Sequence, residues 1–382
     1  IAIGLDAMNG GTTTGDNNIA IGVSAGDALT SGKQNVLMGK DAGGAINSGY
    51  LNTAIGHEAG KAITTGIANT ILGWQAGFAL QTGHNNVFIG REAGKGVTVT
   101  VQNVIAIGHG AATGVMGTGA NYAIAIGYSA LAALTSGANN VAVGGNALKA
   151  NNTGHENTAV GRNVLDANVD GAGNTAMGES SLTANVSGDN NTAVGANSLG
   201  STTGDGNTGF GKSAGSAITG GTYNTCVGYN AATSAVGSTN QTVIGFDAAG
   251  QADNSVTLGN ASVDRVYMAQ DGAAVMYANG TINTSDKRFK KDIKDSDLGL
   301  SFINDLRPVK YKFKNSKNND KKNYGIIAQE VIEVLNKHNA KDFSGIKDDN
   351  KEKLGADYVQ FIAPLIKAVQ ELSAKVEALE NK

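Results

Sequence analysis

A short alternating pattern of bulky and small residues recurs along the first 260 residues. Each copy has a Val, Ile or Thr, a central residue that is usually Ala, an apolar residue and then a glycine, as in residues 53–56, "TAIG". Alternation with a period of two predicts a β-strand with two unlike faces. The closing glycine recurs at residues 4, 22, 39, 56, 73, 90, 108, 127, 144, 161, 178, 195, 211, 228, 245 and 259.

This spacing of about 17 residues is typical of solenoids and fibres, in which each coil buries apolar side chains against its neighbours. A coil of this length is too short for a pair of helices. We expect it to hold the strand, a turn at the glycine, a second short strand around the following Ala-Gly or Ala-Leu pair, and a polar turn. The predicted fold class over residues 1–262 is an all-β repeat fibre, a β-roll or β-solenoid.

The two faces of the predicted strand differ in bulk. The residues on either side of the central position are aliphatic or β-branched, whereas the central residue is usually Ala. We expect each coil to bury the bulky face and to leave the flat alanine face open to another chain. One buried aliphatic residue contributes only about 1.5–3 kcal/mol. Because glycine-rich coils lose much entropy on folding, we expect several chains side by side, as a homotrimer.

Asparagine stands four residues before the glycine in most copies. Stacked coils lie about 4.8 Å apart, so identical Asn side chains can hydrogen-bond along the axis as a ladder. Asn also suits a turn, and neither interpretation implies a ligand site. These asparagines are residues 18, 35, 52, 69, 86, 140, 157, 174, 191, 207 and 224.

The position directly after the glycine varies most and includes Trp74, Tyr128 and Tyr229. Such an outward position can contact a cell-surface glycan or receptor, although a solvated rim with incidental aromatic residues is the simpler interpretation. The histidines of the repeats lack the spacing of metal ligands, so we expect no metal and no cofactor. The single cysteine, Cys226, excludes an internal disulfide and stands where other copies have Ala, so we expect a small packed residue.

Composition and charge change near residue 280. Residues 1–280 hold 9 Lys+Arg and 16 Asp+Glu, and residues 281–382 hold 20 and 16. The resulting net charges of −7 and +4 account for the −3 of the whole chain and indicate two modules with different roles. Residues 263–284 are the expected connector. No apolar run approaches the roughly 18 residues that span a bilayer, and the chain opens inside a repeat, so we expect it to be the C-terminal end of something longer.

The last hundred residues show the pattern of a small α+β domain. Residues 299–313 predict a helix ending at Arg307 and then a strand, and residues 323–338 predict a strand leading into an amphipathic helix. Residues 358–382 predict one long helix. Its apolar residues step by three and four, which indicates a trimeric coiled coil, although a lone helix packed on its own domain has the same pattern. The seam residues are Ile362, Leu365, Val369, Leu372, Val376 and Leu379.

Four segments in order resemble the intramolecular chaperone domain of endosialidase type, which caps phage tailspikes, tail fibres and some cellular proteins. The resemblance implies a domain over 285–382 that trimerises, guides folding of the preceding fibre and often cuts itself off. The segments are "SDKRFKKDI" (285–293), "LRPVKYKF" (306–313), "YGIIAQEV" (324–331) and "PLIKAVQEL" (364–372).

By this resemblance, Ser285 is a nucleophile, Lys290 its base, and Thr284–Ser285 the scissile bond. A serine hydroxyl needs a base, and lysine must lower its pKa from about 10.4 toward roughly 7–8 to act as one. The neighbouring Lys287 and Lys291 push in that direction by like charge. Each chain would cut once as a serine autoprotease. The alternative is a solvated basic patch; interleaved aspartates make nucleic-acid binding a poor fit.

The repeats "NTAIG" (52–56) and "NTAVG" (157–161 and 191–195) resemble the heads of trimeric autotransporter adhesins, which are left-handed parallel β-rolls, and the shafts of phage tail fibres. We therefore expect a trimeric fibre for surface attachment, located on a virion tail or a bacterial surface. One alternative is an adhesin head that binds a host glycan. A polysaccharide depolymerase is less favoured, because the repeats show no non-periodic insertion that would build a groove with clustered acids.

Overall fold

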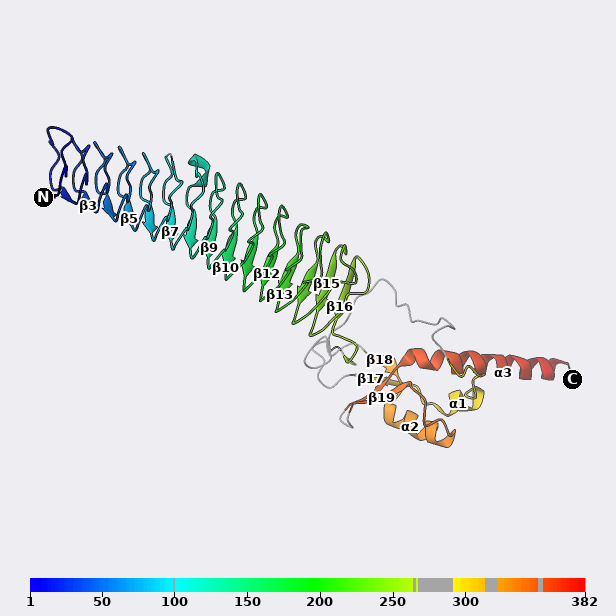
Figure 1. Cartoon of the computed structure of the whole chain (residues 1–382). Coiled ribbons are helices and arrows are strands. Elements are labelled where there is room, and N and C mark those ends of the chain that lie inside the picture. Colours follow the sequence, from blue (N-terminus) through cyan, green and yellow to red (C-terminus); the bar gives the residue numbers. More distant parts are fainter. Residues whose placement is uncertain (99, 264–265, 267–290, 313–321, 350–352, 382) are drawn as a thin grey trace. The chain divides into compact units, whose positions relative to one another are not determined.

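The computed structural model of the chain describes residues 1–98, 100–263, 266, 291–312, 322–349 and 353–381 (Figure 1). The chain divides into two compact units, Ile1–Val275 and Met276–Lys382. The first unit holds the glycine-rich repeats and the second holds the charged C-terminal sequence, in agreement with the change of composition.

The first unit is a parallel β-solenoid of about 15 turns with a period of about 17 residues. Each coil adds one strand to a single sheet, and the sixteen strands follow sequence order (Figure 1). Register pairs equivalent positions of neighbouring coils, as Ala142 with Ala159. This confirms the predicted fold class. The strands are β1 (Ala2–Ile3), β2 (Ile19–Ile21), β3 (Val36–Met38), β4 (Thr53–Ile55), β5 (Thr70–Leu72), β6 (Val87–Ile89), β7 (Ile105–Ile107), β8 (Ile124–Ile126), β9 (Val141–Val143), β10 (Thr158–Val160), β11 (Thr175–Met177), β12 (Thr192–Val194), β13 (Thr208–Phe210), β14 (Thr225–Val227), β15 (Gln241–Ile244) and β16 (Ser255–Leu258).

The expected second strand around the Ala-Gly or Ala-Leu pair is not found in the described coils. This segment is a turn, in which Glu58 and Gly60 have φ angles of 57° and 56°. Left-handed backbone cannot continue an extended strand, so the prediction was wrong. On the return side of the coil, backbone hydrogen bonds such as that from the Gly60 N–H to the Ala76 carbonyl join neighbours. The β-bridges on this side of the described coils are isolated ones, such as Tyr50 to Ile67.

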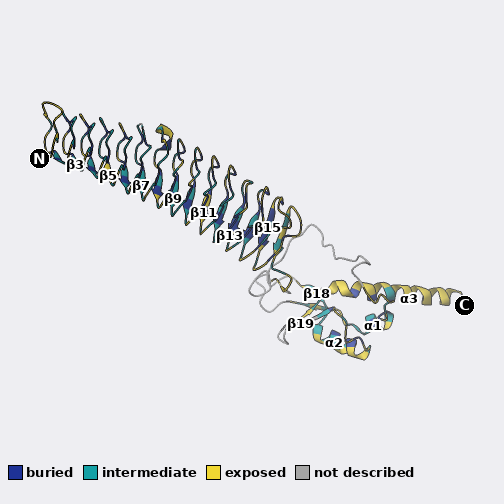
Figure 2. Cartoon of the chain, viewed as in Figure 1, coloured by how far each residue is buried: buried dark blue, intermediate teal, exposed yellow. Residues whose placement is uncertain are grey.

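The two faces of the strands point opposite to the expectation. The central residue of most strands, such as Ala54 or Ala125, is fully buried inside the coil, where Figure 2 shows the strands mostly dark blue. The bulky residue before the glycine points outward, and Phe210 is 57% exposed. The return segment supplies much of the bulk of the interior, from residues such as Ile63 and Leu80. The central residue is therefore usually Ala, although Ile71 and Phe88 are also buried at this position.

The asparagine ladder is confirmed. The Asn52 side-chain amide and its backbone N–H both donate to Asn35 Oδ1, at 3.2 and 3.0 Å, and the same amide donates to the Gly66 carbonyl at 2.7 Å. Each rung thus satisfies buried backbone groups of the next coil, which an apolar residue would leave unpaired. The ladder is interrupted at Val104 and Ala123, in the region of the coils that are 18 and 19 residues long. The 19-residue coil contains the 3₁₀ turn η1 (Thr118–Ala120).

Two kinds of coil recur. In the first kind a glycine, such as Gly60, stands four residues after the closing glycine, and Ile63 fills the interior. In the second kind a leucine stands there instead, such as Leu148 or Leu165, and a buried Asn takes the place of the isoleucine. A Cβ added to Gly60 would come within 2.8 Å of Ile63 Cδ1, so in this coil a side chain at residue 60 competes with Ile63 for space. Other coils combine the two positions differently, and Leu131 and Leu134 are both buried in one of them. The buried asparagines of the second kind are Asn151, Asn168 and Asn185.

The second unit is a small α+β region, as predicted. Two antiparallel hairpins and three helices surround a core that includes Phe302, Val331, Leu335 and Phe361. In the described part of the chain, no helix is long and apolar enough to cross a membrane. The elements are α1 (Leu300–Asp305), β17 (Val309–Tyr311), β18 (Asn323–Gly325), α2 (Ala328–Lys337), β19 (Ile346–Asp349), β20 (Lys353–Ala356), the 3₁₀ turn η3 (Tyr358–Phe361) and α3 (Ile362–Glu380).

Candidate functional site

The predicted self-cleavage residues Thr284, Ser285 and Lys290 lie outside the described residues. Their assignment as scissile bond, nucleophile and base therefore stays a prediction.

Helix α3 has one face against its own domain and another without cover in the single chain. Pro364 and Ala368 are buried, and the Glu371 carboxylate accepts a 2.8 Å hydrogen bond from the Leu300 backbone N–H at the start of α1. A neighbouring face of the helix carries the predicted seam, whose six aliphatic side chains are all at least 45% exposed. Helix α3 therefore packs on its own domain and still leaves its heptad seam exposed. The exposed seam residues are Ile362, Leu365, Val369, Leu372, Val376 and Leu379.

Two ion-paired contacts hold the domain around α1 and α2. Arg307 pairs with Glu330, which joins the "LRPVKYKF" segment to the "YGIIAQEV" segment. Asp305 at the end of α1 lies 2.8 Å from Lys337 Nζ and 2.6 Å from His338 Nε2. These hydrogen bonds, first that of Lys337 and then that of His338, lower the pKa of the Asp305 carboxyl. The segments that carry the resemblance are thus in direct contact.

Residues 285–339 match the family model for the chaperone of endosialidase. The match begins at Ser285 and covers the first three resembling segments, so the C-terminal resemblance is confirmed there; the fourth segment, 364–372, lies beyond it. No curated protein matches the chain. A chaperone-of-endosialidase region behind a parallel β-solenoid fits a phage tail fibre or tailspike.

The solenoid that precedes this chaperone region carries Trp74, Tyr128 and Tyr229 on its outside, 40%, 58% and 49% exposed. They follow the closing glycines of their coils, so stacking aligns them with the equivalent residues of neighbouring coils. The Arg91 guanidinium lies 5.0 Å from the centre of the Trp74 ring. Tyr229 stacks on Phe246 with ring centres 5.6 Å apart. Their exposure agrees with the predicted rim, while a ligand role stays a prediction.

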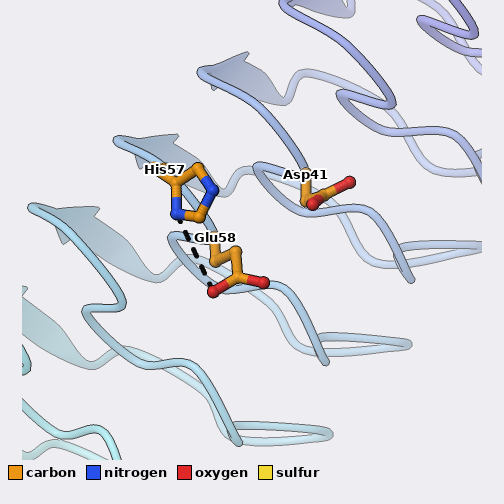
Figure 3. Close-up of side chains that lie close together, drawn as sticks. All are labelled: Asp41, His57 and Glu58. Atoms are coloured by element: carbon orange, nitrogen blue, oxygen red, sulfur yellow. Dashed lines mark ion pairs between the residues drawn. The ribbon is translucent and has the colours of Figure 1, made fainter.

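A further cluster joins Asp41, His57 and Glu58, which come from two neighbouring coils (Figure 3). One possible ligand atom of each lies within 4.8 Å of the others, and His57 Nδ1 is 3.8 Å from Glu58 Oε2. Sequence reasoning missed this group because it compared histidines with each other, whereas the 17-residue period brings Asp41 beside Glu58. Lys61 Nζ lies 2.7 Å from Glu58 Oε1 and 3.7 Å from Asp41 Oδ2. Its ammonium already supplies the positive charge that a metal ion would bring.

Proposed function

We propose that this chain is part of a trimeric attachment fibre, a phage tail fibre or tailspike, and that the region after the solenoid brings three chains together. The observation that carries the proposal is the bare face of α3. Six aliphatic side chains at heptad spacing are at least 45% exposed, directly behind a region that matches a chaperone family. Apolar faces of this kind are buried in oligomers, and steps of three and four suit a parallel coiled coil.

The outer face of the solenoid sheet offers a second contact between chains. The bulky residue before each closing glycine points outward, which gives an aliphatic row on one side of the sheet that includes Leu72, Ile126 and Ile244. In three parallel copies these rows can face a common axis and bury one another. The face that joins chains is then the bulky one, in place of the alanine face expected from the sequence.

A chaperone is needed because the row is repetitive. A shift of one chain by one coil leaves nearly every outward position filled by another aliphatic residue, so side-chain pairing sets the alignment of three chains only weakly. A clamp at one end removes this degeneracy. We propose that α3 and the chaperone region provide the clamp.

Leu365→Glu tests the assembly, because it places a carboxylate on the seam in each of three chains. Desolvation and like-charge repulsion should abolish the trimer, and sedimentation should show monomers or aggregates in its place. Gln370→Glu is the matched control, since it adds the same charge at an exposed position of α3 outside the seam. Trimers of the Leu365 variant as stable as those of the control would contradict the proposal.

We also propose that Ser285 Oγ attacks the Thr284 carbonyl while Lys290 accepts the hydroxyl proton. The C–N bond between Thr284 and Ser285 breaks, the Ser285 amine takes up that proton, and water hydrolyses the resulting ester to a carboxylate and the free hydroxyl. The family match that starts at Ser285 supports this assignment. Electrophoresis of the freshly expressed chain should show a slow split near residue 285. Ser285→Ala should remove the split while the trimer persists. Cleavage that continues at the same bond in this variant would exclude Ser285 as the nucleophile.

A further inference from the structure

We propose that one stretch of the solenoid rim binds an acidic polysaccharide whose sugars carry carboxylates. We call it the basic rim and define it by Trp74, Arg91, Lys95, His109 and Tyr128. The proposal rests on the attachment role above and names the chemical class of its target. The argument uses the placement of these side chains, their pairing and the local charge.

The basic rim is a row built by the coil period. Trp74, Arg91, His109 and Tyr128 each follow the closing glycine of one of four successive coils, and Lys95 comes from the same coil as Arg91. The His109 and Tyr128 rings are 5.5 Å apart, and all four residues are exposed. Neighbouring coils lie about 4.8 Å apart, so a polymer along the solenoid axis would meet a new side chain at every coil.

Arg91 is held in place while keeping its donors free. Its guanidinium lies 5.0 Å from the Trp74 ring centre, and Lys95 Nζ lies 5.5 Å from the same ring. Glu92 is engaged by Lys95 at 2.8 Å, whereas Arg91 Nε is 3.9 Å from the nearer Glu92 oxygen. The Arg91 side chain is 61% exposed. A guanidinium fixed over an aromatic ring loses less entropy on binding, and its planar fork matches a carboxylate in two parallel hydrogen bonds.

The charge of this stretch differs from that of the rest of the solenoid. Residues 74–128 contain two Lys+Arg and one Asp+Glu, whereas the remainder of residues 1–280 contains seven and fifteen. An acidic polymer is therefore repelled by most of the fibre and attracted here. Trp, Tyr and Arg are also the residues that contribute most to binding at protein surfaces. Tyr229 and Phe246 stack on each other in the same row and serve as a comparison.

The test is binding of the full chain to immobilised polygalacturonate, measured by biolayer interferometry. Trp74→Ala and Arg91→Gln should each weaken binding about tenfold or more, because each removes part of the stacked pair. Phe246→Ala, an exposed aromatic of the same row, should leave it unchanged. All three side chains are exposed, so the melting temperatures of the variants should match that of the wild type.

Two further polymers decide whether recognition is specific. Dextran, a neutral polysaccharide, and polyglutamate, an acidic polymer without sugars, should both bind at least about tenfold more weakly than polygalacturonate. Equal binding of polyglutamate, no binding of polygalacturonate, or binding that both rim variants leave unchanged would overturn the proposal. Sedimentation of the same samples reports the trimer separately. Loss of the trimer with retained rim-dependent binding would contradict the proposed assembly alone, and a trimer that does not bind would contradict the basic rim alone.

Discussion

At the scale of single residues, the solenoid places charged side chains where the period stacks them. Lys61 donates to Glu58 within its coil and lies beside Asp41 of the preceding coil. The hydrogen bond from Lys61, and then that from Gln75, lowers the pKa of Glu58, while the bond to Glu58 raises the pKa of Lys61. Lys95 lowers the pKa of Glu92 in the same way. The contacts of Gln75 with Glu58 and of Lys61 with Asp41 join neighbouring coils, so a pattern within a single repeat does not predict the whole network.

Lys61→Met should make the free energy of unfolding less sensitive to a fall in pH. A carboxyl whose folded pKa is lowered adds stability above its unfolded value, about 4.3, and this is lost as the pH falls through the folded pKa. The melting temperature of the wild type should therefore fall more steeply below about pH 5 than that of the variant. At neutral pH the variant should lose at most about 1 kcal/mol of unfolding free energy, because Lys61 is 40% exposed. Identical pH profiles for the wild type and the variant would refute the stabilising contact between Lys61 and Glu58. Lys40→Met is the control, because it removes another lysine near the same carboxylates and should keep the wild-type profile.

At the same scale, burial raises the pKa of the Cys226 thiol to about 11. The residue is fully buried where other coils have Ala, as predicted from the sequence. Its role is packing, because a thiol with so high a pKa is a poor nucleophile near neutral pH.

At the scale of elements, the sequence alone predicts every solenoid strand but not its orientation. Alternation shows that two faces differ, and it does not show which one is inside. The inside is shared between the central strand residue, usually Ala, and the bulky residues of the return segment, such as Ile63 or Leu80. The hairpin of β19 and β20 was also missed, because its charged sequence lacks an apolar alternation. Helices α1, α2 and α3 were predicted, since their apolar spacing is local.

The two kinds of coil predict a coupled pair of substitutions. Gly60→Leu alone should destabilise the solenoid, because the added side chain meets Ile63 and Gly60 has a left-handed backbone. Ile63→Asn alone should do so by losing apolar burial and by burying an amide. Together they recreate the Leu-and-Asn coils seen around Leu148 and Asn151. Calorimetry should show that the double variant loses less free energy of unfolding than the two single variants lose together, by roughly 0.5–3 kcal/mol. Strictly additive losses would show that the positions do not share one volume.

At the scale of the whole molecule, the account depends on three identical chains finding a common alignment. The fold class and the domain character follow from the sequence, because a fixed period and a change in composition are visible along one chain. Contacts between chains cannot be predicted from the sequence in the same way, because they depend on which faces the folded chain leaves exposed. The structure leaves two aliphatic faces exposed, the seam of α3 and the outer row of the solenoid sheet. Both are explained if neighbouring copies cover them.

The most direct test is the solution mass of the full chain, measured by sedimentation equilibrium, with the helical and β signals followed by circular dichroism. The chain mass is 38.6 kDa. We predict a single species of three chains that stays trimeric on dilution to nanomolar concentration. A stably folded species of one chain, with α3 still helical, would contradict the account.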